Sequence, residues 1–190
     1  MSGKIGLGVV GCGNVAGHSY LRHAKELADL VATCDRIEER ARRAYLAYGA
    51  RTYYNRFEDM LEDKRIEAVL ILTPANSHGE LAMEAARAGK HFLVQKMLAM
   101  NMEQANGIVH EAGRRGIKAL AEPAVQLNYF SRKMKELLRG DVIGKAAYAV
   151  CRAEQEGPIE SPAAFEEGPV ISLGIYGVAH MTDLLGPVRA

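Results

Sequence analysis

Gly11-Cys12-Gly13-Asn14-Val15-Ala16 is the stretch that decides the fold, and it stands between an apolar run at residues 5–10 and a helical pattern at residues 15–27. The apolar run predicts a buried strand, and glycines directly after it allow a sharp turn into a helix. Without side chains at Gly11 and Gly13, a diphosphate can approach the backbone, and the helix N-terminus offers it unpaired N–H groups and a positive dipole end. The pattern predicts a phosphate-binding turn formed by Gly11, Gly13, Asn14 and Val15.

An acidic residue, Asp35, ends the second apolar run at residues 30–34. At the tip of the strand beside the phosphate turn, its carboxylate can accept hydrogen bonds from a ribose diol, which completes a dinucleotide site. A carboxylate repels the extra phosphate of NADP, so Asp35 favours NAD, with NADP as the alternative. The neighbouring Arg36 either stacks on adenine or attracts that phosphate, or it is a solvated charge; the residues leave both readings open.

Composition and charge narrow the class of protein. The 190 residues suffice for one ordinary domain, or one domain plus a fragment of another, and the net charge of +1 predicts neither a nucleic-acid partner nor a membrane partner. We find no apolar run long enough to span a bilayer. The cysteines Cys12, Cys34 and Cys151 form neither a C-x-x-C pair nor a zinc spacing, so we expect no metal and a reducing cytoplasm.

Apolar runs alternate with helical patterns through the first two thirds of the chain, which predicts a doubly wound parallel α/β sheet. The expected strands are residues 5–10, 30–34, 51–54, 68–72, 91–94 and 117–121. The expected helices between them are residues 15–27, 37–48, 56–62, 78–88 and 102–115. We therefore expect a dinucleotide-binding domain at residues 1–122.

The composition changes near Glu122-Pro123, and a second, incomplete α+β domain for the substrate is expected at residues 123–190. Residues 129–138 have a helical pattern, and the alternation at residues 145–154 predicts an antiparallel strand. Residues 170–185 are apolar and are expected to be helical in their later part. Because 190 residues hardly supply cover for these apolar segments, we expect a homo-oligomer.

Two further loops should lie at the crevice, because the carboxyl ends of parallel strands face the ligand. In the first loop, Thr73, Pro74, Asn76 and His78 are candidate cofactor-binding residues. The alternative is that Asn76 or Ser77 caps the next helix and that His78 is simply satisfied in its first turn.

The second loop begins at Gln95-Lys96, directly after a predicted buried strand. A lysine at this position can meet a substrate hydroxyl and help to move a proton. We therefore list Gln95 and Lys96 as cofactor-binding candidates and Lys96 also as a catalytic one.

Together, motifs along nearly the whole chain resemble those of the glucose–fructose oxidoreductase / inositol dehydrogenase / rhizopine-catabolism (Gfo/Idh/MocA) family. The motifs are Gly11-Cys12-Gly13-Asn14-Val15-Ala16, Cys34-Asp35, Glu39-Arg40-Ala41, Thr73-Pro74 with His78, Ala88-Gly89-Lys90-His91, Gln95-Lys96-Met97, Lys135-Glu136-Leu137-Leu138, Ile143-Gly144-Lys145 and Leu184-Leu185-Gly186-Pro187-Val188. The resemblance implies a Rossmann domain followed by an α/β substrate domain. It also implies hydride transfer between NAD or NADP and a sugar, polyol or related hydroxyl or carbonyl compound.

The chain departs from the family pattern at two motifs. The family's Glu-Lys-Pro is Gln95-Lys96-Met97 here, so the lysine that the family uses near the reacting carbon is retained while its flanks differ. The family's Asp-x-Gly-x-His is Ser172-Leu173-Gly174-Ile175-Tyr176, which leaves Tyr176 as the proton donor that some branches carry. His180 follows one helical turn later as a third catalytic candidate, or as a plain core or surface histidine.

Family members are substantially longer than this chain, and most of the substrate sheet would lie beyond Ala190. The chain is accordingly expected to be a fragment, a natural truncation or a protomer that a partner completes. Two functions follow: an NAD(P)-dependent oxidoreductase acting on a small sugar-like or polyol-like molecule, or a dinucleotide-binding module that has lost the substrate sheet and the catalytic Asp and His.

Overall fold

A computed structural model describes residues 3–152 and 173–187, and these form two compact units, Met1–Ala121 and Glu122–Ala190. Each unit is described separately below. The predicted boundary after residue 122 stays a prediction, as does a substrate-binding role for the second unit.

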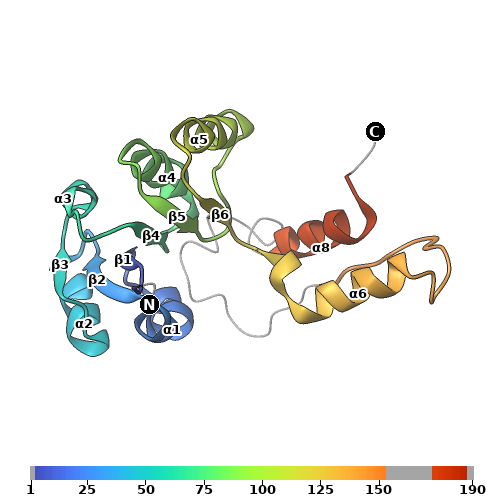
Figure 1. The fold of residues 1–190 in the computed structure, drawn as a ribbon, viewed down its shortest axis with the longest axis horizontal. Helices are drawn as coiled ribbons and strands as arrows, with labels where there is room; N and C mark the ends of the chain where they lie inside the picture. Colours follow the sequence, from blue (N-terminus) through green and yellow to red (C-terminus); the bar gives the residue numbers. More distant parts are fainter. Residues whose placement is uncertain (1–2, 153–172, 188–190) are drawn as a thin grey trace. The chain divides into compact units, whose positions relative to one another are not determined.

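The first unit is built on a parallel sheet of six strands in the order β3-β2-β1-β4-β5-β6 (Figure 1). The strands are β1 (Gly6–Val10), β2 (Asp29–Cys34), β3 (Thr52–Tyr54), β4 (Ala68–Ile71), β5 (His91–Val94) and β6 (Ala119–Ala121). All six predicted strands are confirmed, with their ends within two residues of the prediction. The order reverses direction at β1, between β2 and β4, and such a switch point opens a crevice at the carboxyl ends of the strands.

Helices cover both faces of this sheet (Figure 1). They are η1 (Ala16–Tyr20), a π-helical segment, followed by α1 (Leu21–Leu27), α2 (Glu38–Tyr48), α3 (Phe57–Glu62), η2 (Ala75–Ser77), α4 (His78–Arg87) and α5 (Met102–Arg115). The predicted helices are confirmed within a few residues at each end. The longest of them, α5, begins where the Asn101 side chain accepts a hydrogen bond from the Gln104 N–H, which satisfies one of the free donors of the first turn.

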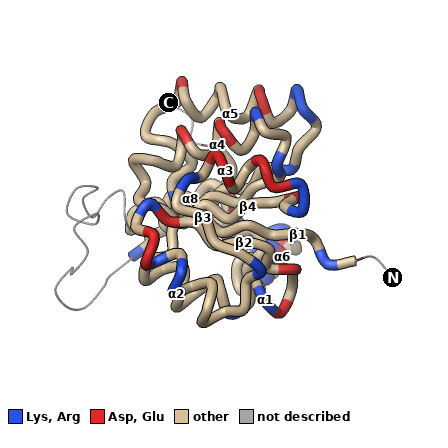
Figure 2. The backbone as a smooth tube through the Cα atoms, turned by 90° about the vertical axis from the view of Figure 1, so that its left-hand side faces the viewer, with Lys and Arg blue, Asp and Glu red and all other residues tan. Residues whose placement is uncertain are grey.

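Side chains of the central strands alternate between two apolar layers, as the two-residue period of a strand requires. Val10, Val31 and Ile71 pack with α3, α4 and α5. Val9 and Leu30 pack on the other side, against η1, α1 and α2. Lys, Arg, Asp and Glu lie on the helices and loops, and Asp29 is the only one of these within the six strands (Figure 2). Burial of each large apolar side chain contributes about 1.5–3 kcal/mol, so the two layers hold the strand tips that carry the site.

The described part of the second unit consists of η3 (Val125–Leu127), α6 (Tyr129–Arg139), α8 (Ile175–Leu185) and irregular chain. The helix predicted at residues 129–138 and the helix in the later part of residues 170–185 are confirmed. The strand predicted at residues 145–154 is wrong for residues 145–152, which form no ladder; residues 153–154 lie outside the described residues. Alternating side chains do not make a strand without a neighbouring strand to pair with.

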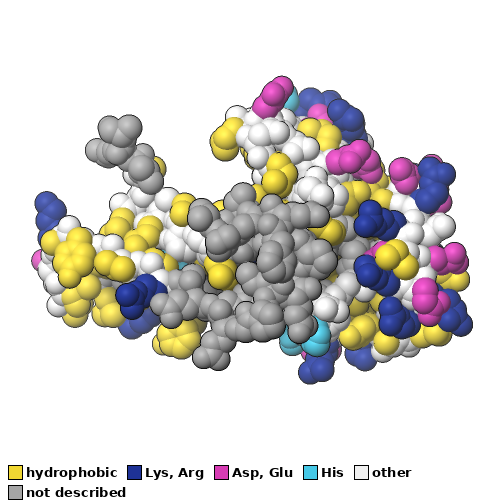
Figure 3. Space-filling model, turned by 180° about the vertical axis from the view of Figure 1, so that it is seen from behind, with side chains coloured by type: hydrophobic (Ala, Val, Ile, Leu, Met, Phe, Trp, Pro, Cys, Tyr) yellow, Lys and Arg dark blue, Asp and Glu magenta, His cyan; other side chains and the backbone are white. Residues whose placement is uncertain are grey.

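Large apolar side chains are exposed over the second unit (Figure 3). They include Tyr129, Phe130, Met134, Val142, Ile143, Tyr148, Val150 and Val178. We call these eight residues the exposed apolar set. Across the described part of both units, none of the helices is long and apolar enough to cross a lipid bilayer.

Candidate functional site

The turn after β1 is the centre of the candidate site. Gly11 has φ +88°, its N–H donates to the Cys34 carbonyl at 2.9 Å, and a Cβ added to it would lie 2.7 Å from the backbone of Leu72 and Thr73. Only glycine fits this position, because both the positive φ and the close approach exclude a side chain. The turn is thereby held between the carboxyl ends of β2 and β4, at the switch point of the sheet.

Gly13, unlike Gly11, is not packed against neighbouring backbone. A Cβ added there would meet nothing within 4 Å, and Gly13, Asn14 and Val15 are all exposed, so packing inside this chain does not require a glycine. The open space lies at the start of the helical stretch 14–27, whose first N–H groups have no carbonyl partner one turn earlier. A side chain at position 13 would occupy the open space beside these N–H groups, which is where a helix N-terminus accepts a phosphate.

Asp35 closes the turn from the tip of β2. Its side chain is buried (7% exposed). One carboxylate oxygen accepts the Cys12 N–H at 2.9 Å, and the other accepts the Ile37 N–H at 2.9 Å. Each oxygen has a second lone pair, so the carboxylate can still accept hydrogen bonds from ribose hydroxyls. Arg36 is exposed next to it, which leaves both readings of this arginine open.

Two cysteines lie beside this carboxylate. Burial, followed by the charge of Asp35, raises the pKa of the Cys12 thiol to about 12. Burial, followed by the coulombic effect of Cys12, raises the pKa of Cys34 to about 12 as well. Both groups therefore remain neutral thiols near neutral pH, which argues against a nucleophilic role.

The loop after β4 carries three of the predicted binding residues, Thr73, Pro74 and Asn76. Thr73 and Ser77 are half-buried, and the Ser77 hydroxyl lies 2.8 Å from both the Thr73 hydroxyl and the Pro74 carbonyl. Pro74 and Asn76 are exposed. Ser77 precedes α4 without making a side-chain cap, so the idea that it caps this helix is wrong.

His78, at the start of α4, is almost fully buried (1% exposed). Its Nδ1 lies 2.6 Å from the Met97 carbonyl oxygen and its Nε2 lies 2.7 Å from the Thr73 carbonyl oxygen. With both ring nitrogens facing backbone, the ring has no polar atom left for a ligand. The prediction that His78 itself binds the cofactor does not fit this geometry; the alternative of an internally satisfied histidine does.

The loop after β5 carries Gln95 and Lys96, both half-buried. The Gln95 amide nitrogen donates to the Tyr20 hydroxyl at 2.9 Å, and its side-chain oxygen accepts the Lys96 N–H at 2.7 Å. The Lys96–Met97 peptide is cis. Sequence reasoning missed Tyr20, since nothing in the pattern links residues that lie 75 positions apart.

The remaining catalytic candidates, Tyr176 and His180, lie one turn apart on α8 in the second unit. Burial, followed by the charge of Glu122, raises the pKa of Tyr176, so its hydroxyl keeps its proton near neutral pH. The Nδ1 of His180 is 3.2 Å from the Ser131 hydroxyl of α6, and Lys135 pairs with Asp183 between the same two helices. Ser172 lies outside the described residues.

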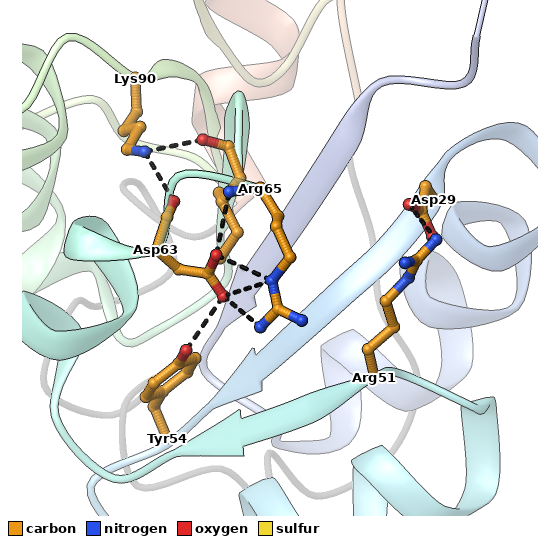
Figure 4. Close-up of polar contacts among 7 residues, drawn as sticks. Asp29, Arg51, Tyr54, Asp63, Arg65 and Lys90 are labelled. Atoms are coloured by element: carbon orange, nitrogen blue, oxygen red, sulfur yellow. Dashed lines mark hydrogen bonds and ion pairs between the residues drawn. The ribbon is translucent and has the colours of Figure 1, made fainter.

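A second group of polar residues surrounds Asp63, with Arg65 and Lys90 just before β4 and β5 and Tyr54 at the carboxyl end of β3 (Figure 4). Asp63 accepts hydrogen bonds from Arg65 and from the Tyr54 hydroxyl at 3.0 Å. The Lys90 ammonium donates to the carbonyls of Asp63 and Ile66 at 3.0 and 2.7 Å. An open depression of about 590 Å³ lies at the amino ends of β1, β2 and β3, and its lining residues are Lys4, Lys25, Ala28, Asp29, Leu30, Tyr48, Gly49 and Arg51. The contacts of Asp63 and Lys90 join segments of the fold, and the depression lies at the strand ends opposite to those where ligands of such sheets bind.

Comparison with protein families gives one match, to the model described as an oxidoreductase family with an NAD-binding Rossmann fold, over residues 5–122. Among curated proteins, the chain is similar to oxidoreductase P35 of Formosa agariphila (31% identity, 82% of this chain, 49% of the relative). It is also similar to a dTDP-3,4-didehydro-2,6-dideoxy-alpha-D-glucose 3-reductase of Actinomadura kijaniata (28%, 96% and 56%). A third relative is the myo-inositol 2-dehydrogenase of Thermotoga maritima (27%, 73% and 42%). The chain thus spans about half the length of these relatives.

Solved structures give the same fold. A 3-ketoreductase from Actinomadura kijaniata, in complex with TDP-benzene and NADP, superposes with a TM-score of 0.79 at 25% identity over 96% of this chain and 57% of that one. A dehydrogenase from Bordetella pertussis, in complex with NADH and UDP-GlcNAcA, superposes with a TM-score of 0.66 at 27% identity over 74% of this chain and 41% of that one.

Proposed function

The chain belongs to the Gfo/Idh/MocA oxidoreductase family, which has an NAD-binding Rossmann fold, and from this premise we propose that it binds a nicotinamide dinucleotide and takes part in hydride transfer. The observation that carries the proposal is the closed turn at the switch point. Gly11 packs where only glycine fits, Gly13 leaves open space beside the first N–H groups of the helix, and Asp35 joins the turn to the tip of β2. Gly11, Gly13, Asn14 and Val15 would hold the diphosphate, and Asp35 would hold the adenosine ribose.

The nicotinamide would lie toward the loops after β4 and β5. Thr73, Pro74, Asn76, Gln95 and Lys96 come from these loops and would line its ribose and ring. Asp35 favours NAD over NADP because its buried charge stands where a 2′-phosphate would come. Arg36 is exposed beside it and is the residue that would admit NADP.

The substrate class that fits best is a sugar, a polyol or a related hydroxyl or carbonyl compound, since curated relatives include reductases and dehydrogenases with such names. A bound nicotinamide supplies the hydride acceptor or donor. Lys96 would exchange a proton with the substrate oxygen. Tyr176 and His180 of the second unit would assist, with Tyr176 as a proton donor. We further propose that the protein works in the cytoplasm as a homo-oligomer in which the exposed apolar set is covered.

Two titrations test this proposal. First, the fluorescence of NADH should change saturably on binding to the chain, and Gly13→Ala should weaken that binding. Second, a panel of sugars, polyols and their keto forms should reveal turnover that Lys96→Ala abolishes while NADH binding persists. Tight NADH binding without turnover on any compound would instead favour the non-catalytic dinucleotide-binding module. Absence of NADH and NADPH binding would exclude both.

A further inference from the structure

The imidazole of His78 joins two loops of the candidate site. Its Nδ1 faces the carbonyl of Met97 in the loop after β5, 2.6 Å away, and its Nε2 faces the carbonyl of Thr73 in the loop after β4, 2.7 Å away. The ring is 1% exposed. The spacing in the sequence is 19 residues to Met97 and 5 to Thr73, so the ring ties together segments that the chain itself does not hold adjacent.

In both contacts the imidazole nitrogen must be the hydrogen-bond donor. Carbonyl oxygens only accept hydrogen bonds, so each nitrogen must carry a proton to bond its partner. A neutral imidazole has one N–H and donates one of the two bonds, whereas a protonated ring donates both. In either state the ring acts on backbone and not on a ligand.

The position of Met97 makes this tie relevant to Lys96. Met97 follows Lys96 directly, and its carbonyl belongs to the next peptide unit, between Met97 and Leu98. On the other side, the Lys96 N–H donates to the Gln95 side-chain oxygen, and the Gln95 amide donates to Tyr20. The backbone of Lys96 is therefore held on its amino side by Gln95 and, one residue later, on its carboxyl side by His78.

We infer that His78 is a positioning residue, which sets the direction of the Lys96 side chain through its hydrogen bond to the Met97 carbonyl. The catalytic meaning of this inference rests on the proposed function, in which Lys96 moves a proton; the geometric part does not. Rigid placement matters because a reacting group displaced by about 1 Å can lose about a hundredfold in rate.

Two conservative variants separate the two ring nitrogens. The amide of His78→Asn reaches the place of Nδ1 and can keep the bond to Met97, whereas the amide of His78→Gln reaches the place of Nε2 and can keep the bond to Thr73. If His78 only fills the core, both variants should disturb the loop after β5 to the same extent. If His78 positions Lys96 through Met97, His78→Gln should disturb that loop far more than His78→Asn.

Hydrogen–deuterium exchange of the full chain without cofactor reads the geometric part directly. Exchange at residues 96–100 should rise about tenfold in His78→Gln and stay at the wild-type rate in His78→Asn, with residues 102–115 unchanged in both. Equal exchange at residues 96–100 in the two variants, whether raised or unchanged, overturns the inference.

Steady-state kinetics test the catalytic part of this inference. With a turned-over substrate, His78→Gln should lower kcat about 10- to 100-fold and leave the Kd for NADH unchanged, and His78→Asn should retain most of kcat. Equal kcat in both variants, with the predicted difference in exchange, would overturn the link to Lys96. If the wild-type chain turns over nothing, the proposed function fails, and the exchange comparison still decides whether His78 orders this loop.

Discussion

The two units differ in how they satisfy their own surfaces. In the first unit, both faces of the sheet are covered by helices, and the loops at the crevice are tied to each other by Asp35, His78 and Gln95. In the second unit, α6 and α8 are joined by two polar contacts, while the exposed apolar set stays open to solvent in this chain. The difference teaches that the first unit covers its own apolar side chains within the described residues, whereas the described part of the second unit leaves the exposed apolar set uncovered.

The largest effect on stability and on NADH binding should come from the glycine turn after β1. Gly11→Ala introduces a methyl group 2.7 Å from backbone at a positive φ, so it should cost about 1–3 kcal/mol or more in stability and abolish NADH binding. The matched control is Gly13→Ala, whose methyl meets open space. It should leave the Tm near that of the wild type and weaken NADH binding at least about tenfold, equivalent to about 1.4 kcal/mol. Thermal melts and fluorescence titrations measure both; a normal melt and normal affinity for Gly11→Ala would refute the role of this turn.

The next effect concerns Asp35, which ties β2 to the turn. Asp35→Ala removes the acceptor for the Cys12 and Ile37 N–H groups and the charge that opposes a 2′-phosphate. We expect NADH affinity to fall about tenfold, with a smaller loss for NADPH. Parallel titrations with both coenzymes give the ratio. Tighter binding of NADPH than of NADH by the unchanged protein would mean that Arg36, not Asp35, sets the preference.

A smaller effect should come from the hydrogen-bond network around Asp63 in the first unit (Figure 4). Hydrogen bonds from Arg65 hold the pKa of Asp63 below its usual range. A lowered folded-state pKa means that Asp63 stabilises the fold fully above the unfolded value of about 3.9, and that this contribution is lost as the pH falls through the lower folded value. Asp63→Asn should therefore cost about 1–2 kcal/mol at pH 7 and less below about pH 4, without changing the Kd for NADH. Urea melts across this pH range measure it; an equal cost at every pH would contradict the assignment.

Substitutions in the exposed apolar set of the second unit should have the smallest effect on folding. They should have a clear effect on self-association. Phe130 is 73% exposed and Tyr148 is 85% exposed, so replacing both by Ser removes little packing within the chain. The Tm should change by a few degrees at most, whereas self-association measured by light scattering should decrease. Leu46→Ser in α2, also an exposed apolar residue (60%), is the control that should leave association unchanged. If the wild type, the double variant and Leu46→Ser all associate equally, the exposed apolar set does not cause the association.

The sequence predicted most of the first unit and less of the second. The six strands and the glycine turn were foreseeable because buried parallel strands are continuously apolar and because Gly11 has to adopt a positive φ. The strand at residues 145–152 was not, since alternation alone does not show whether a pairing strand is present. His78 could be placed in its loop from the spacing, but the direction of its ring depends on Met97, and Gln95 depends on Tyr20. Such long-range contacts leave no local pattern.

Calorimetric titration of the folded 190-residue chain with NADH and NADPH tests the central claim most directly. The account predicts saturable binding of one coenzyme per chain, tighter for NADH, and lost in Gly11→Ala. A well-folded chain that takes up neither coenzyme would contradict it.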